Sequence, residues 1–377
     1  MKEVTLIATA AMGLESIVAG EVKQLGYEVE VENGKIIFTA PLSAIPRCNL
    51  WLRTADRLKI VIGKFKAISF DELFESVKAL PWENYIEEDG EFPVTGKSVK
   101  SKLYSVPDCQ SITKKAIAER LKLKYGLAAN MPETGALYKV EVSILKDEAT
   151  LTIDTSGAGL HKRGYRIGQG EAPLKETLAA ALVLLTNWKP DYPLVDPFCG
   201  SGTIPIEAAL IGQNIAPGFN REFVSEDWKF IKEKYWREAL EEAEDMANYD
   251  QKLEIHGSDI DHKSIQSAVN NANEAGLGDL ISWKQMQVKD LNINRENGYL
   301  IGNPPYGERL GDKSKVAEIY QDLGNIMVNH SSWSVYILTA FEKFENEYGK
   351  TATKKRKLFN GFIQANYYQY FGKKLFA

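Results

Sequence analysis

Four consecutive residues, Asn303, Pro304, Pro305 and Tyr306, have the groups needed to hold a planar amine. The apolar residues 299–302 before them predict a strand, which must end there because each proline lacks an N–H and fixes φ. An Asn side-chain oxygen and a prolyl carbonyl can accept the two hydrogens of an amino group, and the Tyr306 ring can stack on an attached base. The pattern predicts a catalytic loop that turns an exocyclic amine toward an electrophile. The alternative is a proline-rich turn that only closes a strand.

A second segment, residues 194–210, combines a short apolar strand, a glycine turn and a helix. Gly200 and Gly202 allow a ligand to approach the backbone closely, and the N–H groups that open the helix attract a carboxylate or phosphate. The segment has no Gly-Lys-Ser/Thr for a nucleoside triphosphate, and Pro205 or Ile206 stands where a dinucleotide-binding motif has its third glycine. The candidate cofactor-binding residues of this turn are Asp196, Phe198, Gly200, Ser201, Gly202 and Thr203.

Together the two segments resemble a class I S-adenosylmethionine-dependent methyltransferase of the amino-methylating kind, in which the glycine turn precedes the Asn-Pro-Pro-Tyr loop. Residues 160–166 and 172–181 are similar to segments of the THUMP-domain RNA guanine-N2 methyltransferases. The resemblance covers essentially the whole chain. It implies S-adenosyl-L-methionine as the cofactor, no metal requirement, and structured RNA as the partner, with Arg163 and Arg166 among the RNA contacts.

Two carboxylates are expected to complete the cofactor site. Asp259 ends an apolar strand, where an acidic side chain can accept hydrogen bonds from ribose hydroxyls, and Ile260 follows it. Asp261 is assigned instead to the cap of the next helix. Asp290, after a strand expected near 283–290, is positioned to meet the adenine amino group, with a surface carboxylate as the alternative. Asn303 is also expected to border the cofactor. Weaker candidates are Ala172 and Pro173 for the cofactor and Arg309 for phosphate.

Length and composition set limits on the class of protein. A chain of 377 residues is expected to hold two or three domains, and 44% hydrophobic with 26% charged residues is ordinary for a globular protein. No 18-residue apolar run or signal peptide is present, which favours a cytoplasmic protein without a membrane partner. Cys48, Cys109 and Cys199 are too scattered for a disulfide framework or a zinc site. We expect a monomer or weak dimer.

The expected elements indicate α+β domains followed by an α/β domain. Residues 1–65 have the order βαββαβ of a ferredoxin-like domain, with a hairpin that turns at Asn33-Gly34. Residues 66–157 continue with helices and strands and resemble a THUMP RNA-binding domain. Residues 158–377 are expected to form a Rossmann-like class I methyltransferase domain, with a mostly parallel sheet and helices on both faces. One acidic helix is predicted over residues 226–250.

The distribution of charge suggests a local RNA-binding surface. A net charge of −5 argues against a protein that coats nucleic acid non-specifically. Residues 97–124, however, contain eight basic and two acidic side chains, an excess of six positive charges. This cluster is expected to contact phosphate, and a solvated helix face is the alternative. The basic run 354–357, near strands expected at 357–362 and 365–370, is a further candidate for contact with RNA, with a solvated hairpin turn as the alternative. The candidate RNA contacts are Lys97, Lys100, Lys102, Lys114, Lys115 and Lys122, together with Arg163 and Arg166.

The favoured function is methylation of guanine N2 in 23S ribosomal RNA. Transfer RNA is the nearest alternative substrate, and the Asn-Pro-Pro-Tyr motif also suits adenine-N6 methylation of DNA. The absence of a separate DNA-recognition region weighs against DNA. A non-catalytic RNA-binding assembly factor is a further alternative, disfavoured because Asp196, Asp259 and Asn303 are all intact. Cys199 could act as a nucleophile in methylation of pyrimidine carbon, but it lies in the cofactor turn, so covalent catalysis is not expected.

Overall fold

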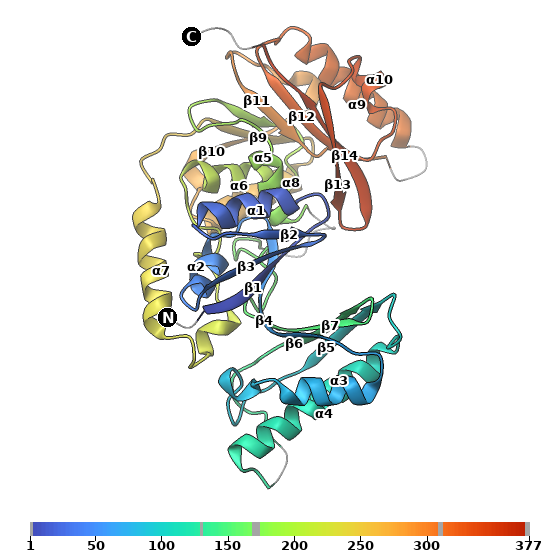
Figure 1. The fold of residues 1–377 in the computed structure, drawn as a ribbon. Coiled ribbons are helices and arrows are strands. Elements are labelled where there is room, and N and C mark those ends of the chain that lie inside the picture. Colours follow the sequence, from blue (N-terminus) through green and yellow to red (C-terminus); the bar gives the residue numbers. More distant parts are fainter. Residues whose placement is uncertain (1–2, 129–130, 168–173, 308–311, 374–377) are drawn as a thin grey trace. The chain divides into compact units, whose positions relative to one another are not determined.

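The computed structural model describes residues 3–128, 131–167, 174–307 and 312–373 (Figure 1). Two compact units are present. Unit 1 comprises residues 1–10, 19–160 and 222–242, and unit 2 comprises residues 11–18, 161–221 and 243–377. The chain therefore passes between the units several times. Ala172, Pro173 and Arg309 lie outside the described residues.

Unit 1 contains a sheet of seven described strands in the order β2-β3-β1-β4-β7-β6-β5. The first part has the predicted βαββαβ order, which confirms the ferredoxin-like arrangement, and Gly34 has the positive φ of 74° that its turn requires. Its elements are β1 (Glu3–Ala10), α1 (Glu15–Gln24, of which residues 15–18 belong to unit 2), β2 (Glu30–Glu32), β3 (Lys35–Pro41), α2 (Ala44–Trp51) and β4 (Ala55–Lys66).

One long strand joins the two halves of this sheet. The 12-residue β4 pairs with β1 along one side and with β7 along the other. It ends at Lys66, beside the domain boundary expected at residue 65, and its pairing with β7 joins the two halves in one hydrogen-bonded sheet. The second half consists of α3 (Phe70–Ala79), η1 (Trp82–Asn84), β5 (Val94–Val99), α4 (Val106–Tyr125), β6 (Val140–Leu145) and β7 (Glu148–Asp154).

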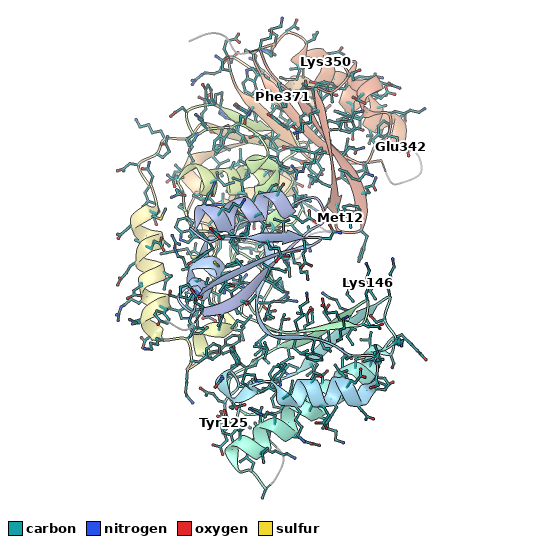
Figure 2. All side chains as sticks on the ribbon, in the orientation of Figure 1. Met12, Tyr125, Lys146, Glu342, Lys350 and Phe371 are labelled. Carbon is teal, nitrogen blue, oxygen red and sulfur yellow. The ribbon has the colours of Figure 1, made fainter. Side chains whose placement is uncertain are left out.

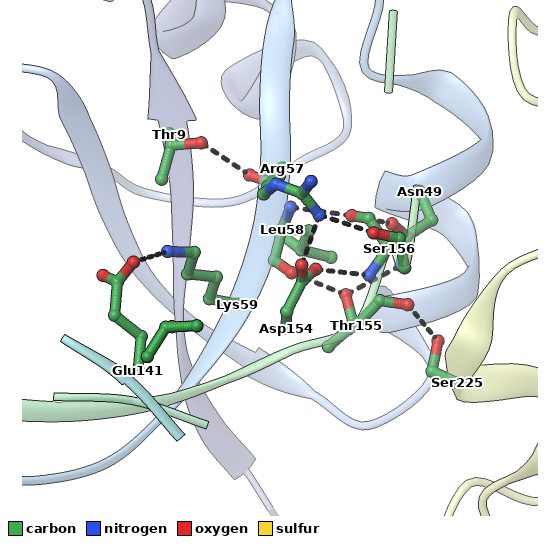
Figure 3. Close-up of polar contacts among 12 residues, drawn as sticks. Thr9, Asn49, Arg57, Leu58, Lys59, Glu141, Asp154, Thr155, Ser156 and Ser225 are labelled. Carbon is green, nitrogen blue, oxygen red and sulfur yellow. Dashed lines mark hydrogen bonds and ion pairs between the residues drawn. The ribbon is translucent and has the colours of Figure 1, made fainter. Parts of the chain in front are cut away.

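A buried polar network fixes the end of β7 in unit 1 (Figure 3). The Asn49 side chain donates to the Thr155 hydroxyl over 2.9 Å and accepts from the Ser156 hydroxyl over 2.7 Å. The Ser225 hydroxyl donates to the Thr155 carbonyl over 2.7 Å. Because buried polar groups need partners, these bonds fix the position of residues 155–156 relative to α2 and to the segment that contains Ser225.

Residues 222–242 return to unit 1 from later in the chain, with η2 (Val224–Asp227) and the start of α7 (Glu233–Met246). The Trp228 indole N–H donates to the Leu137 carbonyl over 3.0 Å, and its ring stacks on Tyr138 with centroids 5.0 Å apart. The single helix predicted over 226–250 is wrong in its extent. Residues 228–232 are not helical, and Trp228 and Ile231 are buried in this segment. The helix begins only at Glu233.

Unit 2 contains a sheet with the strand order β10-β9-β8-β11-β12-β14-β13. The pairs β10–β9, β9–β8, β8–β11 and β11–β12 are parallel, while β14 is antiparallel to both β12 and β13. This confirms the expected mostly parallel, Rossmann-like sheet. Its elements are α5 (Glu176–Leu184), β8 (Leu194–Asp196), α6 (Thr203–Gly212), β9 (Ile255–Asp259), α8 (His262–Glu274), η3 (Gly278–Leu280), β10 (Ile281–Gln285), η4 (Val288–Asp290), β11 (Tyr299–Gly302), α9 (Asp312–Met327), β12 (Ser334–Thr339), α10 (Phe344–Tyr348), β13 (Lys354–Asn360) and β14 (Ile363–Tyr370).

Both faces of the central strands of unit 2 are buried. Along β11, Ile301 belongs to the apolar cluster that includes residues of α5 and α6, whereas Leu300 belongs to the cluster that includes residues of α9 and α10. Residues of β12 alternate between the same two clusters. Successive side chains of a strand point to opposite faces, so these continuous apolar runs are explained by helices on both sides of the sheet, as Figure 1 shows.

Several local features differ from expectation. The sequence did not indicate α9 and α10. The basic run 354–357 lies within β13 rather than in a turn, and Asp290 lies in a 3₁₀ turn after β10 has ended at Gln285. None of the helices in the described ranges has the length and hydropathy of a membrane span. The described His, Cys, Asp and Glu side chains form no group of three placed to hold a metal ion.

Candidate active site

The two predicted loops leave the same edge of the sheet. Strands β8 and β11 are parallel neighbours, with Val195 paired to Leu300, so the residues that follow each strand emerge side by side. The strand order reverses at this point, which is where open α/β sheets bind their ligands. A cavity of about 960 Å³ lies there, and its lining includes residues 196–201 and 203 from one loop and Asn303 and Pro305 from the other.

The glycine turn is rigid because it is packed tightly and bonded from two sides. Gly202 has a φ of 84°, and a Cβ at this position would lie 2.7 Å from the Trp283 ring and 2.9 Å from the Ala268 side chain. The Gly200 N–H donates to Asp259 over 3.0 Å, and the Asn271 amide donates to the Ser201 carbonyl over 2.9 Å. Only glycine therefore fits at position 202.

Asn271 was not identified by sequence reasoning, although its side chain is 1% exposed. Besides its bond to Ser201, it accepts a hydrogen bond from the Ile167 N–H over 2.9 Å. The signal in the sequence was an amide within the buried stripe of α8, next to Ala272. A buried amide needs hydrogen-bond partners, and here the partners are the backbones of two segments that line the cavity.

Asp259 ends β9 and borders the cavity with the neighbouring Ile260. One Asp259 oxygen accepts from Gly200 and the other accepts from the Asp261 N–H over 2.9 Å. A carboxylate has about four lone-pair positions, so it retains capacity for further donors. Ile260 is 63% exposed and presents an apolar face. Asp261 caps α8 as expected, and its hydrogen bonds from Ser264 lower the pKa of its carboxyl.

The base of the cavity is a poor environment for negative charge. Asp196 is 1% exposed, and burial raises the pKa of its carboxyl well above its ordinary value, against the opposing effect of a hydrogen bond from the Phe198 N–H. Burial also raises the pKa of the Cys199 thiol, and Asp196 and Asp259 add to this shift. A thiolate is the nucleophilic form of cysteine, so the structure disfavours Cys199 as a nucleophile.

The two arginines predicted to contact RNA lie within unit 2. Arg166 lines the cavity, where its guanidinium pairs with Glu176 at 2.8 Å and donates to the hydroxyls of Ser201 at 3.1 Å and Thr203 at 3.2 Å. Arg163 is 3% exposed and pairs with the fully buried Glu207 at 3.4 Å. RNA could reach Arg163 only after a rearrangement, whereas Arg166 lies beside the first turn of α6 and suits a carboxylate in the cavity.

In the Asn-Pro-Pro-Tyr loop, one acceptor position of Asn303 is already occupied. The Tyr306 hydroxyl donates to the Asn303 side-chain oxygen over 2.6 Å, and the Asn360 amide approaches that hydroxyl at 3.4 Å. Asn303 and Tyr306 are half-buried, Pro304 is buried and Pro305 is exposed. The loop therefore presents Asn303 to the cavity while an internal donor satisfies its side chain.

A buried hydroxyl chain supports this loop from below. The Tyr320 hydroxyl donates to the Pro305 carbonyl over 3.0 Å and lies 2.8 Å from the Thr339 hydroxyl, which accepts from the Phe341 N–H over 3.0 Å. Tyr320 and Thr339 are both fully buried, and burial raises the pKa of the Tyr320 hydroxyl, so it stays protonated as a donor. Sequence reasoning missed this chain because it comes from α9 and the end of β12.

Asp290 lines a second, smaller cavity of about 430 Å³, together with residues of β9, β10 and the segment 290–295. The larger cavity is lined instead by Met286, Gln287 and Val288 from the segment that leads to Asp290. Contact between Asp290 and adenine therefore stays a prediction. Residues 286–288 are the part of this segment that lines the same cavity as the glycine turn.

The lysine cluster of unit 1 is partly neutralised by acids from other segments. Lys97 pairs with Glu141 at 3.1 Å, and Lys114 pairs with Glu133 at 2.6 Å and lies over the Phe92 ring. Lys115 lies 5.7 Å from the Phe74 ring centroid.

The other predicted lysines of the cluster differ in exposure. Lys122 is half-buried in the last turn of α4. Lys100 and Lys102 are exposed on the loop after β5, where Tyr104 is 84% exposed. The excess of positive charge counted along the sequence is therefore smaller in the folded unit.

Models of three protein families match successive parts of the chain. A model described as "RMKL-like, methyltransferase domain" matches residues 163–369, a model of the RlmL ferredoxin-like domain matches residues 5–59, and a model of the THUMP domain matches residues 67–154. The match to the methyltransferase model extends over more than half of the chain. Sequence and fold thus define a class I methyltransferase domain preceded by ferredoxin-like and THUMP domains.

Two curated relatives and two crystal structures are similar over nearly the whole chain. The "Putative RNA methyltransferase YpsC" of Bacillus subtilis is 64% identical over 99% of this chain and 97% of its own length. The "Ribosomal RNA large subunit methyltransferase K/L" of a Shewanella species (strain MR-4) is 34% identical over 96% of this chain, which spans about half (52%) of that protein. A "predicted N6-adenine-specific DNA methylase" from Listeria monocytogenes is 62% identical with a TM-score of 0.96, over 99% of this chain and 97% of its own. SMU.472, "a putative methyltransferase complexed with SAH", is 47% identical with a TM-score of 0.96, over 100% of both chains.

The chain therefore belongs to the RMKL-like methyltransferase family. Its cofactor is S-adenosyl-L-methionine, and the residues of the larger cavity fit that molecule. The cavity lies at the upper end of the usual range for small-molecule pockets, about 300–1,000 Å³. For a carboxylate the cavity offers the guanidinium of Arg166 and the N-terminus of α6. For a ribose diol it offers the acceptor Asp259, and for a base it offers the exposed apolar side chain of Ile260.

Proposed function

We propose that this protein transfers a methyl group to guanine N2 of 23S ribosomal RNA. The observation that carries the proposal is the shared cavity, which brings Asn303 and the glycine turn together at one edge of the sheet. The THUMP domain and the names of the B. subtilis and Shewanella relatives support RNA as the substrate. An Asn oxygen and a prolyl carbonyl are matched to the two hydrogens of an exocyclic amine.

Within this proposal the residues of unit 2 hold the cofactor in one orientation. Arg166 and the N-terminus of α6 bind the carboxylate, Asp259 accepts from the ribose hydroxyls, and Ile260 packs on the adenine. S-adenosyl-L-methionine supplies a methyl group on a sulfonium, which leaves as a neutral thioether. The new N–C bond forms as the C–S bond breaks, the C–S electron pair stays on sulfur, and the amine releases one proton to water.

At the acceptor end, the base amine replaces the Tyr306 hydroxyl as the donor to Asn303. Its second hydrogen bonds to the Pro304 carbonyl, and the released Tyr306 ring stacks on the base. These bonds align the nitrogen lone pair with the methyl carbon, so the protein contributes mainly proximity and orientation. The Tyr320 hydroxyl keeps the prolyl backbone in place during this exchange by holding the Pro305 carbonyl.

Methylation of adenine N6 in DNA is the second candidate, favoured by the Asn-Pro-Pro-Tyr motif and by the name of the Listeria structure. Adenine N6 is also an exocyclic amine, so the loop alone does not discriminate between the two bases. The THUMP domain favours RNA, because in this resemblance it is the RNA-binding module. Transfer RNA is the nearest alternative within the RNA class.

The test is nucleoside mass spectrometry of ribosomal RNA, transfer RNA and genomic DNA from a strain that lacks this gene. We expect N2-methylguanosine to fall in 23S ribosomal RNA at one mapped position, and the purified protein to restore it in vitro. Purified Asn303→Ala protein is the matched control and should not restore it. Loss of N6-methyladenine from DNA, or of N2-methylguanosine from transfer RNA alone, would overturn the proposal.

A further inference from the structure

The turn between β13 and β14 exposes an aromatic ring in an unusual position. Asn360 pairs with Ile363, so the loop contains only Gly361 and Phe362. Gly361 has a φ of 62°, which suits the first position of a two-residue hairpin turn. Phe362 has a relative exposure of 106%, the largest among the exposed hydrophobic residues of the described chain. Single exposed apolar side chains are common, but this ring lies beside the Asn-Pro-Pro-Tyr loop.

The hairpin tip lies next to the catalytic loop. The Asn360 amide is 3.4 Å from the Tyr306 hydroxyl, which itself donates to Asn303 over 2.6 Å. Phe362 is two residues from Asn360, and consecutive Cα atoms are 3.8 Å apart, so their Cα atoms are within about 7.6 Å. Two hydrogen bonds and one tight turn therefore connect the exposed ring with the residue proposed to bind the base amine.

The hairpin that carries Phe362 is firmly anchored in unit 2. The Arg356 guanidinium donates to the Gly13 carbonyl over 2.6 Å and to the Ser16 hydroxyl over 2.9 Å. Leu358 is fully buried in the apolar core, and β14 continues the central sheet through its pairing with β12. The ring is thus presented from a fixed position at the end of the sheet.

The charge near the tip suits a nucleic acid. Lys357 is exposed on β13, three residues before Asn360, while Lys355 is engaged by Glu345 and Lys354 lies at the far end of the strand, opposite Gln369. An exposed lysine beside a turn that carries an exposed aromatic ring can contact a phosphate while the ring contacts a base. An apolar surface of a partner protein would not need this lysine. RNA is therefore the occupant that the hairpin favours.

We propose that Phe362 is a wedge that enters the base stack when the target nucleotide leaves it. A base inside a helix must be swung out before an enzyme can act on it, and proteins use apolar side chains to hold such a gap open. The inference rests on the proposed function and makes it more specific. The target amine belongs to a nucleotide stacked in a paired RNA segment, and Phe362 takes its place beside the neighbouring base.

The matched control is Phe371, which follows the opposite end of β14. Figure 2 labels Phe371 at the far end of this strand from the hairpin tip. Nine residues separate the two positions, which corresponds to about 30 Å along a strand. Phe371 is 47% exposed and contacts Tyr336 at a centroid distance of 6.3 Å. The same substitution at this position removes an exposed ring of the same kind, far from the catalytic loop.

The experiment compares F362A, F371A and F362W with the wild type on two RNAs. The first is 23S ribosomal RNA from the deletion strain, folded with Mg²⁺, and the second is a short single-stranded RNA that carries the mapped target. We expect F362A to lower kcat/KM about 10- to 100-fold on folded RNA, in line with the loss of one base–aromatic stack. On the single strand it should stay within about threefold of wild type, because no stack has to be opened. F362W should retain most of the activity on folded RNA.

Equal activity of F362A and F371A on folded RNA would overturn the wedge, and so would an equal loss on both RNAs. The slope of log Kd against log salt should be the same for F362A and wild type, because no phosphate contact is removed. A changed slope would show that the hairpin acts through charge instead. If the wild type methylates neither RNA, the result counts against the proposed function itself. Failure of the proposed function can therefore be distinguished from failure of the wedge.

Discussion

The two loops that meet at the carboxyl edge of the sheet are built differently. The glycine turn is enclosed, with no room for a side chain at Gly202 and with buried bonds from Asn271 and Asp259 to its backbone. The catalytic loop has an exposed Pro305 and depends on side-chain hydroxyls, one of which occupies an acceptor of Asn303. For the proposed reaction, this difference predicts a cofactor end held by packing and buried hydrogen bonds, and an acceptor end in which the Tyr306 hydroxyl competes with the base amine for Asn303.

The sharpest way to separate the two ends is Asn303→Ala. It removes the acceptor for the amine and leaves the glycine turn intact, so we expect kcat to fall at least about 100-fold. The affinity for S-adenosylhomocysteine, measured by calorimetry, should stay within about threefold. Turnover close to wild type would eliminate the assigned role of Asn303, and a parallel loss of cofactor affinity would show that the two ends are not independent.

The next largest effect is expected from Tyr320→Phe. The ring still packs on Phe344, with centroids 4.9 Å apart, but the Pro305 carbonyl loses its donor. Losing one buried hydrogen bond costs about 1–2 kcal/mol, and we expect kcat to fall about tenfold while KM for S-adenosyl-L-methionine is unchanged.

Tyr370→Phe is the control, because the buried Tyr370 donates to the Lys350 carbonyl over 3.0 Å and is not bonded to the loop. This substitution should lower the free energy of unfolding by a similar amount without lowering kcat. If the two variants lose equal activity, Tyr320 has no specific role in positioning the loop.

Asp196→Asn tests the enclosed end through pH dependence. Because burial raises the pKa of Asp196 above its unfolded value of about 3.9, the folded state binds more protons, and stability is lost as pH rises from about 4 toward the folded pKa. The asparagine side chain of the variant does not titrate, so the stability of the variant does not fall with rising pH for this reason. We expect its unfolding free energy relative to wild type to increase as pH rises from about 4 toward the folded pKa, by at most about 1.4 kcal/mol per pH unit. Urea unfolding at several pH values measures this, and a gap that narrows with rising pH would refute the assignment.

The smallest effect is expected from Cys199→Ala. Burial raises the pKa of this thiol, so it has no thiolate to offer at neutral pH. Methyl transfer should stay within about twofold of wild type, and iodoacetamide at pH 8 should not inactivate the wild-type enzyme. Complete loss of activity in the alanine variant, with cofactor affinity retained, would instead indicate a covalent role.

The parts of the site that were predicted are those that a short segment specifies by itself. Asn303 and Pro305 follow a strand, Gly202 needs a positive φ, and Asp261 caps the helix that begins one residue later. Each depends on backbone rules that act over a few residues, so the sequence alone reveals them.

The residues that were missed act across long distances in the chain. Asn271 bonds to Ser201, 70 residues away, and Tyr320 reaches Pro305 from a helix that the sequence did not indicate. Arg166 was assigned to RNA, but its partners place it beside the glycine turn. The residues next to an arginine in the sequence do not indicate which side chains it will pair with. Tertiary structure is therefore needed to distinguish a guanidinium that lines a cavity from one on the surface.

The return of residues 222–242 to unit 1 limits how this protein can be divided. A fragment that ends at residue 157 would lack Trp228, leaving Tyr138 without its stacking neighbour and the Leu137 carbonyl without its donor. A fragment that starts at residue 158 would carry that tryptophan with nowhere to insert it. Neither fragment contains all the residues that it needs to fold. Recombination between related genes is therefore expected to exchange these domains together or not at all.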